Sequence, residues 1–198
     1  IVKGYLLPKT VNSKTLVVAT SISGNTIETL TALDSARKIN CKIIALSSGG
    51  KMEELCIKYN LDYRKIPQIH SPRASFTKFL YSLLNILGDL IPITKNDVDE
   101  SIFELKKLQK KISSSNLSKL NPSLELANWL EGIPLIYYPS GLNSTAIRFK
   151  NSLQENSKLH VIIEDVVEAC HNGIVSWEKK SDVKPILLQG KDDFEKTK

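Results

Sequence analysis

The chain has 198 residues, of which 41% are hydrophobic and 24% are charged, and its net charge is +6 at pH 7. This composition is that of an ordinary globular protein and excludes a chain that is disordered throughout. No apolar run reaches the roughly 20 residues of a membrane-spanning helix, so we expect no membrane partner. The lysines are spread out and no arginine-rich run occurs, so we expect no nucleic-acid partner, whereas an anionic small substrate suits the charge.

Cysteine and histidine usage indicates the compartment. Cys41, Cys56 and Cys170 form no C-x-x-C pair, and such a sparse set is typical of reduced thiols, so we expect a cytoplasmic protein. The three histidines lack the spacing of a zinc site, so we expect no metal. The first residue is isoleucine and residues 192–198 are a charged stretch, so we expect both ends to be cut from a longer parent.

The first part of the chain alternates short β-branched runs with amphipathic segments. The expected strands cover residues 14–20, 42–46 and 62–66, and the expected helices cover 26–39 and 51–59. Strands that alternate with helices in this way are typical of a parallel α/β sheet. Asn25 and Glu28 have the spacing of a capping pair for the first helix.

The middle of the chain is helical, and the α/β alternation then returns. The expected helices cover residues 73–87, 97–112 and 123–130. The expected later elements are strands over 133–138, 159–163 and 183–188, with a loop and helix over 141–155. The sequence therefore predicts an α/β fold with two parallel sheets and flanking helices.

A polar turn, Ser21-Ile22-Ser23-Gly24-Asn25-Thr26, lies between the first strand and the first helix. Ligands of open α/β sheets bind beyond the carboxyl ends of the strands, and a helix N-terminus there offers N–H groups and partial positive charge to an anion. Hydroxyl side chains around one glycine add donors. On residue types alone, a phosphate site and a merely well-capped helix explain this turn equally well.

Arg73 follows Pro72 at the start of an expected helix. The positive end of the helix dipole makes this a poor place for a cation, so we expect Arg73 to have a carboxylate or a ligand as partner. The alternative is a surface arginine without a functional role.

The polar turn, the segment around Arg73 and two segments in the last third of the chain resemble sequence motifs of the bifunctional phosphoglucose/phosphomannose isomerase family. The members of this family consist of SIS (sugar isomerase) domains. TLVVATSISGNTIETL resembles the family's phosphate-binding turn, although the family usually has tyrosine where Ile22 stands. SPRAS resembles the segment that carries an active-site arginine. RFKN followed by QENSK, and EACHNGIVSWE, resemble the signatures R-x-K-N with E-N-A-K and E-x-N-H-N-E-I-x-G-W-E.

The resemblance implies the roles of individual residues. Ser21, Ser23 and Thr26 would bind the sugar phosphate, and Arg73 would lie in the active site. Glu155 would be the base that moves a proton between C1 and C2, and the helix C-terminus before it suits a proton acceptor. His171, sixteen residues later, would assist ring opening. Without the resemblance, Glu155 is a solvated helix-end glutamate and His171 a polar loop histidine.

The resemblance also implies an activity and an assembly. The expected reaction interconverts glucose 6-phosphate, and mannose 6-phosphate, with fructose 6-phosphate through an enediol, in glycolysis and gluconeogenesis, without a metal or organic cofactor. The expected assembly is a homodimer in which His171 comes from the neighbouring subunit. The alternatives are a non-enzymatic SIS module that senses a sugar phosphate, which would not need both Glu155 and His171, and an interaction domain with a polar turn.

The resemblance divides the chain into three parts. Residues 1–94 would be the C-terminal part of a first SIS domain, 95–131 a helical connector, and 132–198 the N-terminal part of a second SIS domain. A first phosphate loop and a catalytic lysine would lie outside this chain, so we expect little turnover from these residues alone. The chain also departs from the last signature, because Cys170, Gly173 and Ser176 replace its asparagine, glutamate and glycine.

Overall fold

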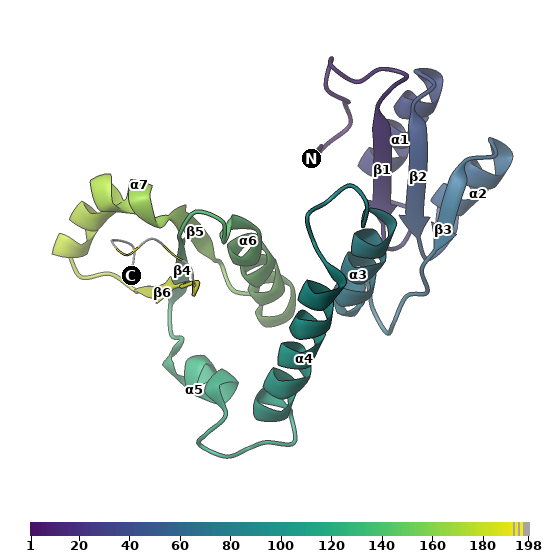
Figure 1. The fold of residues 1–198 in the computed structure, drawn as a ribbon. Helices are drawn as coiled ribbons and strands as arrows, with labels where there is room; N and C mark the ends of the chain where they lie inside the picture. Colours follow the sequence, from purple (N-terminus) through teal and green to yellow (C-terminus); the bar gives the residue numbers. More distant parts are fainter. Residues whose placement is uncertain (192, 194, 196–198) are drawn as a thin grey trace. The chain divides into compact units, whose positions relative to one another are not determined.

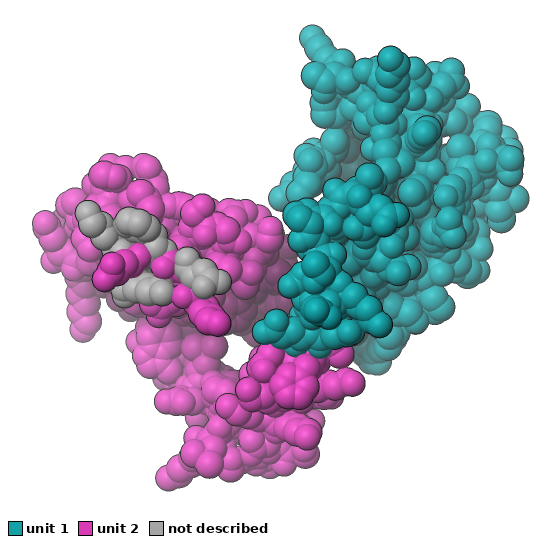
Figure 2. All heavy atoms as spheres, viewed as in Figure 1, with its two compact units in different colours: residues 1–101 teal, residues 102–198 magenta. Residues whose placement is uncertain are grey.

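A computed structural model describes residues 1–191, 193 and 195 (Figure 1). The remaining residues of the charged end considered above lie outside this description. The chain divides into two compact units, which comprise residues 1–101 and 102–198 (Figure 2). Each unit contains a three-stranded sheet in which all strands are parallel, with helices beside it. The predicted α/β class is confirmed, and the three-part division at residues 94 and 131 stays a prediction.

The sheet of unit 1 has the order β1-β2-β3. Its strands are β1 (Leu16–Ser21), β2 (Lys42–Ser47) and β3 (Asp62–Lys65). The connecting helices are α1 (Ile27–Lys38) and α2 (Gly50–Lys58). All five elements were predicted, with ends that differ by one or two residues.

The helices of unit 1 cover both faces of its sheet. Because successive strand residues point to opposite faces, the two faces contribute to two separate cores. One core joins the sheet to α1 and α2, and its buried members are Ala19, Leu33, Ala36, Ile43, Ala45, Met52 and Cys56. The other joins the opposite face to α3 (Phe76–Ile86) through Leu46, Ile66 and Phe79. The result is a three-layer α/β/α unit.

The middle of the chain is helical, as predicted. A 3₁₀ turn, η1 (Arg73–Ser75), precedes α3, so the predicted helix 73–87 begins with a tighter turn. Next come α4 (Lys95–Ile112) and α5 (Pro122–Trp129). None of the helices in the described part of the chain has the length and apolar character that a bilayer crossing requires.

The sheet of unit 2 has the order β5-β4-β6. Its strands are β4 (Ile133–Tyr138), β5 (Ile162–Asp165) and β6 (Val183–Leu187). The helices around it are α6 (Asn143–Ser152), the π-helical turn η2 (Leu153–Ser157), α7 (Val166–His171) and the 3₁₀ helix η3 (Gly173–Glu178). Helix α6 packs on one face, where Ile136, Ala146 and Val161 are buried together.

In unit 2 the bounds of one strand were predicted wrongly and one helix was not predicted. The strand predicted over residues 159–163 begins only at Ile162, because Lys158 ends η2 in the left-handed region (φ 59°) and the following residues reach the core without joining the ladder. Leu159 and Val161 pack in that core. The apolar character of this segment therefore reflects its burial and not a β-strand. Helix α7 was not predicted, because six residues are too few to show a helical period.

The stability of unit 1 depends on the packing of α1 on the sheet. Leu33 is 0% exposed, so we expect Leu33→Ala to lower the free energy of unfolding by about 2–5 kcal/mol through lost burial and the cavity left behind. Ile27 lies on the same helix but is 62% exposed, so Ile27→Ala is the control and should change it by less than about 0.5 kcal/mol. Urea unfolding measures both, and equal losses would contradict the packing described.

Candidate functional site

The polar turn predicted as a phosphate site follows β1 directly, at the carboxyl end of that strand. Ser21 is buried, and its Oγ accepts a hydrogen bond from the Gly24 N–H at 3.1 Å. Ser21 Oγ also lies 2.9 Å from Thr26 Oγ1. Ser23 Oγ accepts from the Asn25 N–H at 3.2 Å. The turn therefore brings the hydroxyls of Ser21 and Thr26 into contact, whereas the Ser23 hydroxyl binds the backbone of Asn25.

This turn packs against the turn that follows β2, with no room for a side chain between them. Gly24 has φ 71°, and a Cβ atom there would lie 1.8 Å from the carbonyl oxygen of Gly49. A Cβ at Gly50 would lie 2.6 Å from the carbonyl oxygen of Ser23. Glycine at both positions allows this close approach.

The contact between the turns satisfies the N-terminus of α2. The Lys51 N–H donates to Asn25 Oδ1 at 3.1 Å, and the Met52 N–H donates to the Gly24 carbonyl oxygen at 2.9 Å. The first N–H groups of a helix have no partner within the helix. The polar turn after β1 therefore supplies hydrogen-bond acceptors for the first N–H groups of α2. The predicted capping pair of Asn25 and Glu28 is therefore wrong, because Asn25 caps α2 instead of α1.

The N-terminus of α1, in contrast, remains open. Its N-cap residue is Thr26, whose side chain makes no capping hydrogen bond and instead contacts Ser21 Oγ. Thr26 is exposed and Ser23 is half-buried, so neither residue is enclosed in the core. An uncapped helix N-terminus combines N–H donors with partial positive charge, and an anion can satisfy both. This geometry favours the phosphate site over the merely capped helix.

Arg73 begins η1 in the same unit and is exposed. Phe76, three residues later, lines a small apolar groove of about 210 Å³ together with Ile22 of the polar turn. Ile22 and Phe79 also share one core. The start of α3 therefore lies beside the candidate phosphate turn. The segment η1, which carries Arg73, directly precedes α3.

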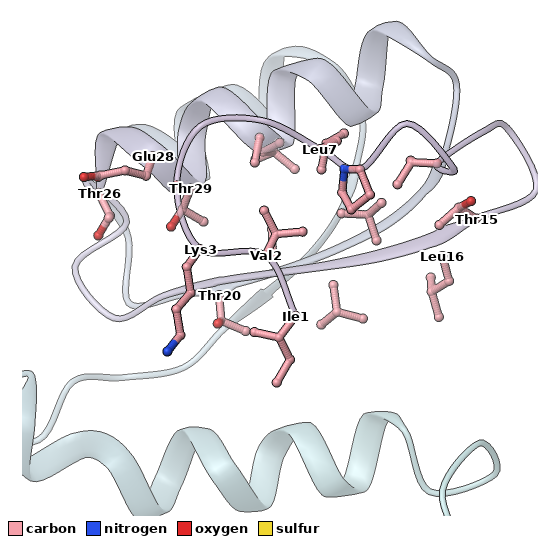
Figure 3. Close-up of a pocket in the computed structure, with 18 of the residues that line it drawn as sticks. Ile1, Val2, Lys3, Leu7, Thr15, Leu16, Thr20, Thr26, Glu28 and Thr29 are labelled. Atoms are coloured by element: carbon pink, nitrogen blue, oxygen red, sulfur yellow. The ribbon is translucent and has the colours of Figure 1, made fainter. Parts of the chain in front are cut away.

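A larger cavity of about 890 Å³ runs along β1 (Figure 3). Five consecutive strand residues, 16–20, line it, and since such residues alternate between the two faces, the cavity follows the strand edge. Figure 3 shows Ile1, Val2 and Lys3 crossing it and Thr20 and Thr26 at one end. Neither Ser21 nor Ser23 lines it, and most of its lining side chains are apolar. It adjoins the phosphate turn but differs from it in chemistry.

Glu155 lies in the middle of η2, a π-helical turn that directly follows α6. The predicted single helix therefore changes its winding before the glutamate. Glu155 is exposed, and its backbone carbonyl accepts a hydrogen bond from Lys158 Nζ at 2.6 Å. Single π-helical turns are frequent at functional sites, and this one is a signal that the sequence did not disclose.

His171 is the exposed last residue of α7 rather than a loop residue. Asp165 fixes the start of this helix, because its Oδ1 accepts from the N–H groups of Val167 at 2.9 Å and Glu168 at 3.4 Å. Our sequence reasoning missed this positioning residue. The available signal was Asp165 followed three residues later by Glu168, the spacing of a helix start.

The predicted site residues are divided between the two units. Unit 1 holds Ser21, Ser23, Thr26 and Arg73, and unit 2 holds Glu155 and His171. No group of three histidine, cysteine or acidic side chains in the described ranges is arranged to hold a metal ion. Burial raises the pKa of the Cys56 thiol, which makes it a poor nucleophile. The predicted site residues supply hydroxyls, an arginine, a carboxylate and an imidazole.

Residues 119–198 match the family described as the bacterial phospho-glucose isomerase C-terminal SIS domain. Over 185 residues the chain is 36% identical to the bifunctional phosphoglucose/phosphomannose isomerase of Caldicellulosiruptor bescii, an alignment that covers 89% of the chain and 53% of that protein. Over 165 residues it is 33% identical to the D-glucosamine-6-phosphate 4-epimerase of Sulfolobus acidocaldarius, which covers 83% and 51%. The chain thus spans about half the length of these curated relatives.

The fold is also similar to that of solved structures. The crystal structure of glucosamine-6-phosphate deaminase from Thermotoga maritima matches with a TM-score of 0.71 at 15% sequence identity, and the match covers 96% of this chain and 57% of that one. At this identity the likeness concerns the fold alone.

The close approach of the two turns makes a test of the site's architecture. We expect Gly24→Ala to destabilise unit 1 by about 2–4 kcal/mol, because a methyl group would overlap the Gly49 carbonyl and a left-handed alanine is strained. Gly4 is the matched control, since it also has a positive φ but its Cβ would meet nothing within 4 Å. Urea unfolding compares the two variants, and equal effects would show that strain alone matters.

Proposed function

This chain is related in sequence to the bifunctional phosphoglucose/phosphomannose isomerases, and we propose that it is part of a sugar-phosphate isomerase. The proposed substrates are glucose 6-phosphate and mannose 6-phosphate, each interconverted with fructose 6-phosphate. The observation that carries the proposal is the uncapped N-terminus of α1 beside the hydroxyls of the polar turn. A phosphate group supplies the charge and the acceptors that this turn lacks.

In the proposed reaction, the protein binds the substrate by its phosphate and acts on the other end of the sugar. Ser21, Ser23 and Thr26 bind the phosphate, and the guanidinium of Arg73 stabilises negative charge on an enediolate oxygen. The imidazole of His171 assists opening of the sugar ring. The carboxylate of Glu155 then removes the proton from C2 and returns it to C1, so no net oxidation occurs and no redox cofactor is consumed.

A second candidate reaction is epimerisation at C4 of an amino-sugar phosphate. It is favoured by the 33% identity to the D-glucosamine-6-phosphate 4-epimerase, close to the 36% identity to the isomerase. Product analysis after incubation with each sugar phosphate separates the two reactions, because isomerisation changes C1 and C2 and epimerisation inverts C4. A sensor without catalysis would bind these compounds and release them unchanged.

We also propose a setting for this activity. The proposed enzyme is a cytoplasmic homodimer of glycolysis and gluconeogenesis, in which His171 serves the active site of the neighbouring subunit. The support for this is the sequence relationship together with the sparse cysteines. We further propose that these 198 residues alone convert little substrate.

Binding at the turn can be tested by thermal stability. Because a ligand that binds only the folded state stabilises it, glucose 6-phosphate should raise the Tm. The double variant Ser21→Ala/Thr26→Ala should remove this shift, since it deletes both hydroxyls that meet in the turn. Thr31→Ala on the exposed surface of α1 is the control and should keep the shift. An undiminished shift in the double variant would show that the turn does not bind the phosphate.

The role of Glu155 can be tested in full-length protein by isotope exchange. Glu155→Gln keeps the volume but cannot accept a proton, and a positioned general base is worth about 10²–10⁴ in rate. We expect a loss of turnover of that order, together with loss of C2 proton exchange with deuterated solvent. Phosphate-dependent stabilisation should survive. Normal exchange would assign the base to another residue.

His171→Ala should behave differently from Glu155→Gln. We expect it to slow turnover of closed-ring substrate more than proton exchange on the open-chain form, because its proposed role ends once the ring is open.

A further inference from the structure

The segment that carries His171 continues over one face of the unit 2 sheet. Tyr137 and Glu164 are register partners in the parallel pair of β4 and β5, so their side chains leave the sheet on the same face. Trp177 of η3 donates from its indole Nε1 to Tyr137 Oη at 3.0 Å. Helix η3 is therefore tied to the carboxyl end of the sheet on this face.

The same helix meets Glu164 at its first residue. A Cβ atom at Gly173 would lie 3.1 and 3.2 Å from the two carboxylate oxygens of Glu164. Gly173 is not among the residues with positive φ, so its backbone does not require glycine. What glycine provides here is room for the carboxylate.

Three carboxylates cluster around this segment, and two of them have structural roles. Asp165 caps α7. Glu168 accepts a hydrogen bond from Asn172 Nδ2 at 2.7 Å. Among the residues that the structure describes, no group donates to the carboxylate of Glu164 or forms an ion pair with it, although the side chain is only half-exposed. A half-exposed carboxylate to which no protein group donates can accept hydrogen bonds from a ligand in place of water.

We propose that Glu164 is a substrate-binding residue, whose carboxylate accepts hydrogen bonds from hydroxyl groups of the hexose phosphate. It lies at the carboxyl end of a parallel strand, where ligands of such sheets bind, and against the segment that begins with His171. A few placed polar groups fix the orientation of a small ligand, and a carboxylate can accept from two neighbouring hydroxyls at once. This inference rests on the proposed function and adds the sugar contact that the phosphate turn cannot make.

The test compares two ligands in full-length protein by titration calorimetry. Glucitol 6-phosphate has the hydroxyls and the phosphate but no carbonyl to isomerise, and inorganic phosphate has no carbon chain and no alcohol hydroxyls. We expect Glu164→Gln, which keeps the shape, to weaken glucitol 6-phosphate about tenfold or more and to leave inorganic phosphate unchanged, as expected for the loss of hydrogen bonds to a charged group. The Tm without ligand should not change.

Glu131→Gln is the matched control, because Glu131 is an exposed glutamate that precedes β4, at the opposite end of the sheet. It should bind both ligands as the parent does. Equal binding of glucitol 6-phosphate by the Glu164→Gln variant and the parent would overturn the proposal. So would an equal loss for both ligands, which would indicate a structural role, or a parent that binds glucitol 6-phosphate no better than phosphate.

The proposed function can fail separately. A protein that binds glucitol 6-phosphate through Glu164 but converts no hexose 6-phosphate would refute the isomerase and support the binding role of Glu164.

Discussion

The contact between Gly24 and the carbonyl of Gly49 is the constraint on which the candidate phosphate site depends. Two strand-to-helix turns lie at one edge of the unit 1 sheet, and each leads to a helix whose first N–H groups need partners. Close packing lets Asn25 and the Gly24 carbonyl satisfy α2. The same packing turns Asn25 away from α1, whose N-terminus stays uncapped. The protein thus satisfies the N-terminus of one helix, and the N-terminus of the other is the one proposed to bind an anion.

In unit 2, likewise, some carboxylates have hydrogen-bond partners in the protein and one has none among the described residues. Asp165 and Glu168 both hold α7 and its continuation in place through hydrogen bonds. Glu164 lies on the neighbouring position of the same strand end but makes no such bond within the described residues. Helix η3 lies over it because Gly173 has no side chain and Trp177 is held by Tyr137. Structural hydrogen bonds therefore position the segment that carries His171, and the remaining carboxylate faces that segment.

The sequence predicted most of the fold, because strands and helices of ordinary length show their period. It failed where several elements compete for one residue or where an element is short. Asn25 had the right spacing to cap α1, but its side chain instead accepts a hydrogen bond from the Lys51 N–H, 26 residues away in the chain. Helix α7 has six residues, and only its cap could have disclosed it. The hydroxyl turn could be predicted from residue types, whereas Glu155 and His171 are exposed side chains whose proposed roles came from the resemblance.

The two units would contribute differently to the choice of reaction. A phosphate held at a helix N-terminus contacts only the group that every hexose 6-phosphate shares, so the turn of unit 1 cannot distinguish an isomerase from an epimerase. Relatives with both names resemble this chain at similar identity, 36% and 33%. In the proposed reaction, discrimination would come from groups that meet the sugar hydroxyls and the reacting carbons, because the wrong substrate leaves such groups without their hydrogen-bond partners. In unit 2 such groups are the proposed Glu155, His171 and Glu164. Because Gly173 gives Glu164 its place, a change at either position should alter which sugar is accepted before it alters whether phosphate binds.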